Sequence, residues 1–384
     1  MKKVGVLLPG STTHPQMGYD FFFGLKKGLK QYFRDSITLI SANIGYGKDE
    51  EVLYKEAEQL VLNHDVILLV AFADYPKAEK LVTLSEKLDI PLILVGSGAR
   101  FPNPKVHSKV WYLNLGELFA MSFLGIQVKK QHQTSQISLQ TDFYNGGYDM
   151  FDAFGKSFGS LEEKIGAINI SSTKEEEFSI ESIKPFFNSG KKPQVILSIL
   201  SAPSSGFFLE KIKTENIEST LLASPTFIQE LMIKKEKEEE FSGLFSGCST
   251  WVVGKDHTKD KKFTENFIAD LSRFHSPYTA LGWEVSLFIE RMLELELSNS
   301  SSSFSPESLD QSFLSHPIQG VRGILHFDSP SRSFLSELYW VEVSSDSIQV
   351  TEIEIETALS AWKQTLQKTP APLYPGWVNT YLCS

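Results

Sequence analysis

The sequence opens on a short apolar run that ends at a proline and a glycine, and this unit constrains the fold more than any other feature. Residues 4–8 are almost wholly apolar, and Pro9-Gly10 follows them directly. Such a run is typical of a buried parallel strand whose carboxyl end leads into a loop. A helical pattern then covers residues 19–33. The chain therefore begins with a strand–loop–helix unit, the arrangement that places ligands at the carboxyl ends of strands.

The same alternation continues along the chain and then starts again. Strand patterns cover residues 37–42, 66–70 and 92–95, with helical patterns at 50–62 and 76–88 between them. The second series contains helical patterns at 115–130 and from about Asp149, with strand patterns at 136–139, 164–170, 195–199 and 221–223. This alternation predicts an α/β fold with two parallel sheets flanked by helices. Because 384 residues exceed the size of one ordinary core, we expect two lobes with a ligand cleft between them.

Composition excludes several classes of protein. An apolar content of 41% and a charged content of 22% are those of an ordinary globular protein. The longest apolar stretches, such as residues 66–73, are too short to cross a bilayer, so we expect no membrane insertion. A formal net charge of -10 argues against a nucleic-acid partner. Cys248 and Cys383 lie far apart and give no metal-binding spacing, so we expect one buried thiol and one thiol near the tail.

The sequence carries no recognisable catalytic motif. It has no phosphate-binding Walker loop, no G-x-S-x-G elbow and no H-E-x-x-H metal helix. The glycines of Gly45-Tyr46-Gly47-Lys48 lack the third glycine of a dinucleotide loop and are typical of a turn. The eight histidines form no close pair in the sequence. We therefore expect a protein that is not an enzyme and that has no cofactor and no metal.

Several motifs follow one another in a recognisable order. Residues 90–99 read Ile-Pro-Leu-Ile-Leu-Val-Gly-Ser-Gly-Ala, and residues 320–328 read Gly-Val-Arg-Gly-Ile-Leu-His-Phe-Asp. The second motif is similar to the F-x-G-x-x-G-x-I-x-F-D signature of the type I periplasmic ligand-binding proteins, the leucine/isoleucine/valine-binding group. Here Ile318 stands for the first Phe and Leu325 for the Ile of that signature. Together with the opening strand and Gly10, these motifs make the chain resemble that family over nearly its whole length.

The resemblance implies a fold and a function. The fold is a clamshell with three hinge crossings, near residues 113–117, 245–252 and 324–331. Lobe 1 then comprises residues 1–115 plus 250–325, and lobe 2 comprises residues 116–249 plus 326–384. The implied function is capture of a small polar ligand, amino-acid-like or related, in the inter-lobe cleft for ABC-type import, with an ABC permease as partner. The alternative is a cytosolic ligand sensor on the same scaffold, acting on a signalling partner. The family implies a periplasmic location, whereas a native start at Met1 without a signal peptide implies the cytoplasm.

The resemblance also places the ligand-binding residues in the loops after the strands. First-lobe candidates are Ser11, Gln16 and Met17, then Asp74 and Tyr75, then Ser97, Gly98, Ala99 and Arg100. Second-lobe candidates are Asp142, Tyr144, Ser201 and Thr226.

Asp74 departs from the pattern of branched-chain amino-acid binders, which have a serine or threonine after the third strand. Its carboxylate repels a ligand carboxylate and favours an amine or a hydroxyl. Arg100 either offsets this charge or itself binds an acid in bidentate fashion. Structural roles remain open for both residues, because Asp74 is also suited to cap a helix that starts at Pro76, and arginine is commonly a surface residue. Tyr144 either contacts the ligand or packs in a turn.

Overall fold

The described residues form two compact units, and each unit draws them from two separate segments of the chain. The computed structural model describes residues 2–11, 14–33, 36–47, 49–103, 105–132, 136–143, 145, 149–159, 163–186, 194–215, 217, 219–254, 257–298 and 305–368. The first unit comprises Met1–Leu115 and Gly254–Ser336, and the second comprises Gly116–Val253 and Glu337–Pro370. The boundaries of the two hinged lobes given above stay a prediction.

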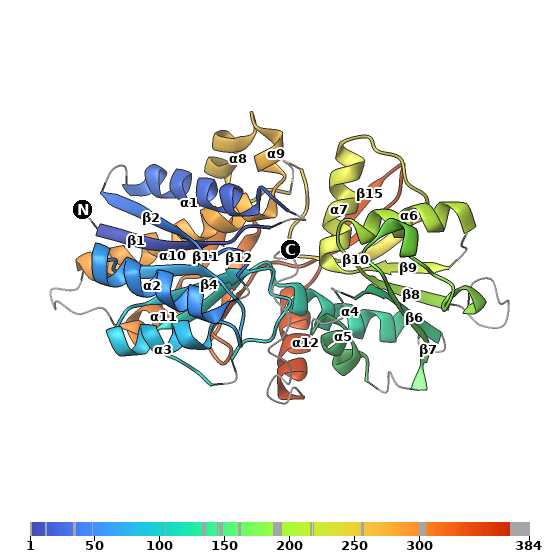
Figure 1. The fold of residues 1–384 in the computed structure, drawn as a ribbon, viewed down its shortest axis with the longest axis horizontal. Coiled ribbons are helices and arrows are strands. Elements are labelled where there is room, and N and C mark those ends of the chain that lie inside the picture. The colour runs from blue at the N-terminus through green and yellow to red at the C-terminus, as the bar shows by residue number, and fades with distance from the viewer. Residues whose placement is uncertain are drawn as a thin grey trace. The chain divides into compact units, whose positions relative to one another are not determined.

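The first unit is a mostly parallel sheet with helices on both faces (Figure 1). Its strands are β1 (Lys2–Leu8), β2 (Ile37–Asn43), β3 (Leu68–Phe72), β4 (Leu92–Gly96), β5 (Val110–Asn114), β11 (Ile318–Gly320), β12 (Gly323–Asp328) and β13 (Ser333–Leu335). Its helices are α1 (Met17–Phe33), α2 (Glu50–His64), α3 (Glu79–Leu88), α8 (Lys261–Phe267), α9 (Leu271–Phe274), α10 (Pro277–Ser298) and α11 (Pro306–Ser315). The strand order is β11-β12-β13-β5-β4-β3-β1-β2, and β13, β5, β4, β3, β1 and β2 run parallel to their neighbours in this series.

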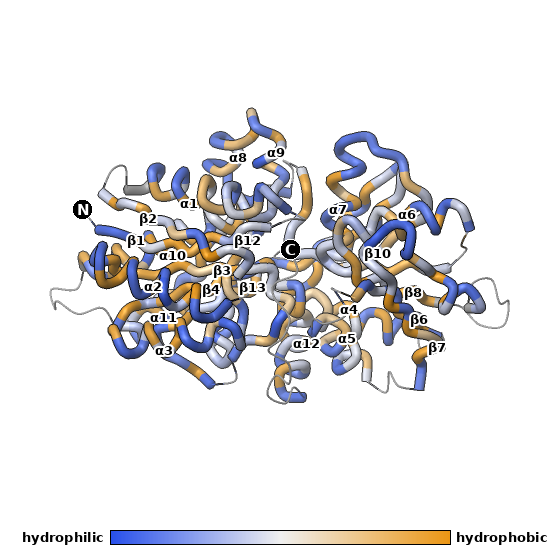
Figure 2. Tube along the Cα trace, viewed as in Figure 1, coloured by the Kyte–Doolittle hydropathy of each residue, from blue (hydrophilic) through white to orange (hydrophobic). Residues whose placement is uncertain are grey.

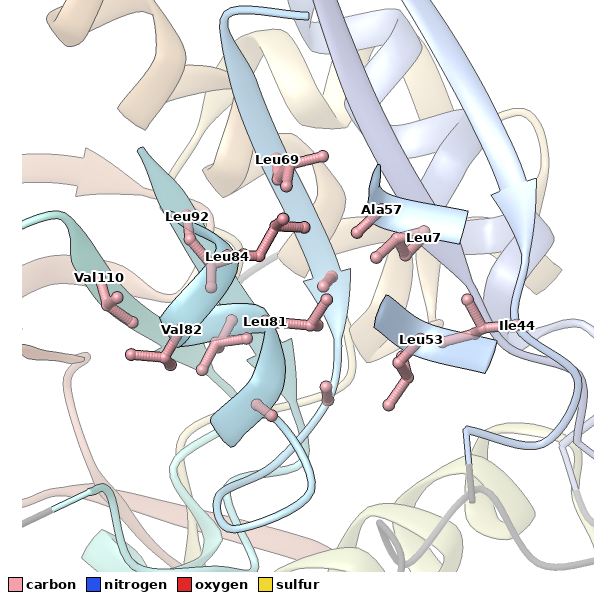
Figure 3. Close-up of a cluster of buried hydrophobic side chains, with 14 of the residues drawn as sticks. Leu7, Ile44, Leu53, Ala57, Leu69, Leu81, Val82, Leu84, Leu92 and Val110 are labelled. Atoms are coloured by element: carbon pink, nitrogen blue, oxygen red, sulfur yellow. The ribbon is translucent and has the colours of Figure 1, made fainter. Parts of the chain in front are cut away.

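Alternate side chains of the strands enter two separate apolar layers. On β3, Leu69 and Ala71 belong to a buried cluster with Leu53 of α2 and Leu81 of α3, which Figure 3 shows in close-up. The next residue, Phe72, points to the other layer, where its ring meets Phe21 of α1 edge-on at 4.7 Å between centroids. Both faces of the sheet are therefore covered, and Figure 2 shows how the apolar residues concentrate on the strands and on the inner sides of the helices.

The motif at residues 320–328 forms a hairpin in which β11 and β12 pair antiparallel. Arg322, at the turn, donates from its Nε and Nη2 to Glu284 Oε2 on α10 at 2.9 and 2.6 Å, and both side chains are at most 1% exposed. A Cβ at position 320 would lie only 2.8 Å from Glu284 Oε1, so Gly320 leaves the space that this carboxylate fills. The glycines of the motif therefore serve a buried ion pair as well as a tight turn.

The second unit is a separate mixed sheet with its own helices. Its strands are β6 (Gln136–Asp142), β7 (Ile165–Ser171), β8 (Gln194–Ile199), β9 (Thr220–Ala223), β10 (Phe245–Ser249), β14 (Tyr339–Val343) and β15 (Ile348–Glu352). Its helices are α4 (Glu117–Gln131), α5 (Met150–Phe158), α6 (Ser204–Glu215), α7 (Pro225–Glu236), α12 (Ile355–Gln367) and the short 3-10 helices η3 (Glu175–Glu177) and η4 (Lys184–Phe186). The strand order is β15-β14-β10-β9-β8-β6-β7, with β14 and β15 antiparallel to their neighbours and the other strands parallel.

Packing in the second unit joins segments far apart in the sequence. The C-terminal helix α12 lies against α4 and α5, where Ser157 and Thr365 share a buried hydrogen bond of 2.6 Å. A Cβ on Gly125 of α4 would stand 2.3 Å from the carbonyl oxygen of Phe154, so only glycine allows α4 and α5 to approach this closely. On β10, Cys248 is a buried free thiol, as the sequence predicts, whereas Cys383 lies outside the described residues.

The α/β fold with two largely parallel, helix-flanked sheets is confirmed. Element boundaries shift in places: the third strand lies at Leu68–Phe72 rather than 66–70, and α3 begins at Glu79 rather than at Pro76, because residues 75–78 form a turn. None of the helices in the described part of the chain combines the length and apolar character needed to cross a membrane.

Candidate functional site

In the first unit, three predicted loops meet at one edge of the sheet. Strands β4, β3 and β1 are consecutive neighbours and run parallel, so their carboxyl ends lie side by side. Ser11 follows β1, Asp74 follows β3 and Ser97 follows β4. The parallel order of these three strands therefore brings the three loops to one edge of this sheet.

The loop after β1 is held by its own polar groups. Ser11 is partly buried, and its Oγ accepts a hydrogen bond from the backbone N–H of His14 at 2.9 Å. Burial lowers the pKa of His14 to about 4, so this imidazole is neutral at physiological pH. Gln16 is exposed, whereas Met17, the first residue of α1, is 2% exposed. These two neighbours therefore differ sharply in their access to solvent.

Asp74 and Tyr75 follow β3 and are both partly buried. Because α3 begins at Glu79, with Ala78 at its N-cap and no side-chain capping bond, Asp74 does not cap a helix that starts at Pro76. Both residues lie near the Tyr112 hydroxyl, which accepts a hydrogen bond from the Asn103 N–H at 3.2 Å. Burial, assisted by Asp74 and Tyr75, raises the pKa of Tyr112 to about 12, so this edge holds a neutral phenol beside a carboxylate.

The loop after β4 is buried throughout. Ser97, Gly98, Ala99 and Arg100 are all buried, and Arg100 is 7% exposed, so it is not a surface arginine. Gly98 has a φ of 76°, a backbone conformation that favours glycine. Within the described part of the chain, the fully buried Ser97 Oγ has no hydrogen-bond partner. The buried hydroxyls of Ser138, Ser198 and Ser204 in the second unit are in the same condition, and each such group in a folded protein calls for an explanation.

In the second unit, a buried polar network links the ends of β6 and β8. The Asp142 carboxylate accepts hydrogen bonds from Asn145, at 2.5 Å from the backbone N–H and at 3.0 and 2.9 Å from Nδ2. Asn145 Nδ2 also lies 3.2 Å from Ser201 Oγ, in the loop after β8. Asp142 and Ser201 are 2% and 3% exposed. Two predicted residues are thus brought together by a third, Asn145, that the sequence analysis did not single out.

Thr226 lies at the start of α7, after β9, and is 1% exposed. Its hydroxyl donates a hydrogen bond to Glu117 Oε1, and Glu117 is itself fully buried at the start of α4. The Thr226 hydroxyl therefore already has a carboxylate acceptor inside the second unit. Tyr144, also predicted to bind the ligand, lies outside the described residues.

Glu230 of α7 is a partly buried residue near this edge that the sequence analysis did not single out. Its Oε1 accepts the Ala202 backbone N–H at 2.9 Å, and its Oε2 accepts the Ser205 hydroxyl at 2.5 Å. Burial raises the pKa of Glu230 to about 7, while these two bonds and the charge of Lys234 lower it. A glutamate within a helix is usually exposed, so no local signal identifies this position.

The described side chains offer no obvious metal centre: His, Cys, Asp and Glu do not gather there in a group of three or more that could hold an ion. The second unit's strand-end edge is rich in carboxyl groups: Asp142 and Glu117 are buried, and Glu230 is partly buried. The first unit's edge holds the partly buried Asp74 in the loop after β3 and the buried Arg100 in the loop after β4. Hydrogen bonding to small polar groups is the chemistry that these residues can perform.

Neither the known protein families nor the curated proteins include a match to this sequence. Solved structures do share its fold. A benzoate-bound solute-binding protein of an ABC transporter from Rhodopseudomonas palustris superposes with a TM-score of 0.68 at 14% identity, covering 98% of both chains. An ABC transporter substrate-binding protein from Sphaerobacter thermophilus gives 0.69 at 14% identity, covering 92% of this chain and 97% of that one. A leucine-binding protein from Thermotoga maritima gives 0.63 at 14% identity, covering 93% and 99%.

These likenesses extend over nearly the whole chain and show its fold. The protein has the two-unit α/β fold of the type I periplasmic solute-binding proteins. The resemblance predicted from the sequence motifs is confirmed for the fold.

Proposed function

We propose that this protein is a solute-binding protein that captures one small polar molecule and delivers it to an ABC-type importer. The structural neighbours are solute-binding proteins of ABC transporters, and one binds benzoate while another is a leucine-binding protein. We propose the same function for this chain. The polar groups at the strand-end edges of both units are the features of this chain that support it.

The observation that carries the proposal is the Ser97 hydroxyl. It is fully buried at the carboxyl end of β4 and has no hydrogen-bond partner among the described residues. Burying an unsatisfied hydroxyl costs free energy, and a bound polar solute removes that cost by supplying the partner. The neighbouring backbone at the positive-φ Gly98 is suited to close approach of a ligand.

We further propose that the ligand is amino-acid-like or a related molecule with an amine or hydroxyl group. Asp74 in the first unit and Asp142 in the second favour a hydrogen-bond donor over a second carboxylate. A carboxylate on the same solute has Arg100 as its best partner, because a guanidinium binds a carboxylate with two parallel bonds. We propose that one solute contacts the strand-end residues of both units.

Import with a permease as partner is preferred to ligand sensing, because the structural neighbours are transport proteins. Binding without chemical conversion of the solute belongs to the same proposal. The neighbours named above are binding proteins rather than enzymes.

A thermal-shift screen tests this function. The panel contains L-leucine, L-isoleucine, benzoate, 4-hydroxybenzoate, short amides and polyamines, and calorimetric titration then measures stoichiometry for each molecule that raises the melting temperature. We expect one molecule bound per chain and recovery of the same molecule unchanged. A melting temperature that no panel member moves at millimolar concentration, or a solute that is chemically converted, contradicts the proposal.

Substitutions then test the place of binding. We expect Ser97→Ala and Asp142→Asn each to weaken binding of the discovered solute about tenfold or more, a loss of about 1.4 kcal/mol. The first removes a buried hydroxyl, and the second replaces a charged acceptor by a neutral amide. Ser345→Ala and Asp346→Asn are matched controls, since both residues are exposed in the turn between β14 and β15. Equal affinities in all four variants place the solute elsewhere.

A further inference from the structure

Glu230 is a partly buried carboxyl group whose hydrogen bonds reach the loop that carries Ser201. It belongs to α7, yet it accepts hydrogen bonds from the Ala202 N–H, in the loop before α6, and from the Ser205 hydroxyl, in the first turn of α6. The four residues 200–203 join β8 to α6, so Glu230 ties this loop to a different helix. A side chain from α7 thus determines where the loop after β8 sits.

The tied loop carries a predicted ligand-binding residue. Ser201 directly precedes Ala202, and its Oγ lies 3.2 Å from Asn145 Nδ2, which contacts the Asp142 carboxylate. Two sets of hydrogen bonds, joined by the peptide link between Ser201 and Ala202, therefore connect α7 through the β8 loop to the end of β6. Ala202, whose N–H bonds to Glu230, is the residue next to Ser201 in the sequence.

We propose that Glu230 is a positioning residue of the binding face, which holds the loop after β8 against α7 and so fixes Ser201 without contacting the solute itself. This proposal rests on the proposed function for its effect on binding, but the position of the loop can be measured without a ligand. The geometry that supports the proposal is the pair of hydrogen bonds that Glu230 accepts, one from the backbone of the loop at Ala202 and one from Ser205 in the first turn of α6.

The surroundings of Glu230 give this role a characteristic pH dependence. Glu230 contacts Ser205 of α6. The charge of Asp142, at the end of β6, raises the pKa of Glu230, and the charge of Lys234, on the same helix α7, lowers it. Burial is the largest influence and raises its pKa from 4.5 to about 7. If the loop opens and Glu230 becomes solvated, its pKa returns toward 4.5, so the closed loop binds the proton more tightly than the open loop. By linkage, the closed loop is favoured at low pH and opens more readily as pH rises through about 7.

Hydrogen–deuterium exchange of the peptide covering residues 200–206 tests the proposal on the ligand-free protein. In the wild type, we expect protection, corrected for the intrinsic exchange rate, to fall about tenfold between pH 6 and pH 8, the change that linkage gives for a pKa moving from 4.5 to 7. Glu230→Gln, which accepts the Ala202 N–H with its Oε1 and can donate to Ser205 with its Nε2, should keep the protection and lose the pH dependence. Glu230→Ala should lose protection at both pH values.

The control is Glu236→Ala, at the exposed end of the same helix, which should match the wild type. Circular dichroism identifies variants that fail to fold, and the Gln variant keeps the test decisive if the Ala variant does so. Unchanged protection in folded Glu230→Ala, or a pH dependence that persists in Glu230→Gln, overturns the positioning role.

The binding arm uses L-isoleucine and benzoate as probes, because solved neighbours hold these solutes. For a probe that binds, the affinity of the wild type relative to Glu230→Gln should fall as pH rises from 6 to 8. A constant ratio overturns the effect on binding. If the protein binds neither probe, that result counts against the proposed function. The exchange experiment needs no ligand and still decides the positioning role.

Discussion

At the scale of single residues, the buried Glu284–Arg322 pair gives the sharpest prediction for stability. Both side chains are almost completely excluded from solvent and are joined by charge-assisted hydrogen bonds. Removing one partner of such a pair leaves a buried charge uncompensated. We expect Arg322→Ala to lower the free energy of unfolding by about 3–5 kcal/mol, measured by urea denaturation.

Lys80→Ala provides the comparison, because Lys80 and Glu51 form an exposed ion pair on the surface of the same unit. Its urea midpoint should equal that of the wild type within error, since surface pairs are screened by solvent. Equal midpoints for the two variants would show that the Glu284 carboxylate finds another partner or becomes protonated.

The raised pKa of Glu230 predicts a pH-dependent contribution to global stability. In the unfolded chain this carboxyl group ionises near 4.5, and in the folded chain near 7. Its contribution is fully present below about pH 4.5 and is lost as pH rises through about 7, because the folded state then holds a buried charge. We expect the stability of the wild type relative to Glu230→Gln to fall between pH 5 and pH 8, by at most about 3 kcal/mol. A flat difference in urea denaturation across this range contradicts the pKa shift.

At the scale of elements, α1 and α10 approach so closely that glycine is required between them. A Cβ on Gly24 of α1 would lie 2.1 Å from the carbonyl oxygen of Thr279. Gly282 of α10 has the reciprocal relation to the Phe21 carbonyl oxygen, also at 2.1 Å. Because backbone atoms are in the way, the two helices must separate to accept a methyl group. We expect Gly24→Ala to destabilise the protein by about 1–3 kcal/mol in urea denaturation.

Gly206→Ala is the matched control on helix α6. A Cβ there has no heavy atom within 4 Å. Alanine should therefore stabilise the protein slightly, by up to about 1 kcal/mol, through its higher helix propensity. A stabilising Gly24→Ala would show that the α1–α10 packing adjusts without cost.

The sequence predicts those elements whose physical signal is local. Continuous apolar runs identify the buried parallel strands, and β4 is placed to within one residue at its end. The start of α3 is missed because the helical pattern extends back over a turn at residues 75–78, where the chain bends without helical hydrogen bonds. Packing, rather than propensity, decides that boundary.

In the candidate site too, the residues with a local sequence signal are predicted and those without one are missed. Ser97 follows β4 in the first sheet, and Asp142 and Ser201 lie at the ends of β6 and β8 in the second. Within each sheet, parallel pairing alone brings strand-end residues to one edge. Glu230 and Glu117 lie in helices, where glutamate is ordinarily solvated. Only the folded unit shows that they meet Ser205 and Thr226, because those contacts join segments 25 and 109 residues apart.

At the scale of the whole molecule, two units with separate sheets raise the question of whether binding stabilises both. Cys248 on β10 reports on the second unit, since its thiol is buried and burial raises its pKa, which suppresses the reactive thiolate. In a Cys383→Ser background it is the single cysteine of the sequence. Reaction with a disulfide reagent then requires the second unit to open.

We expect a solute present at a hundredfold its dissociation constant to slow this labelling about a hundredfold, because opening of the second unit destroys a face that contacts the solute. The labelling rate is followed by the absorbance of the released thiol product. In Asp142→Asn, a higher solute concentration should be needed for the same protection. A labelling rate that the solute leaves unchanged would mean that β10 opens while the solute stays bound. The second unit would then contribute nothing to binding, and the proposal that both units contact the solute would be wrong.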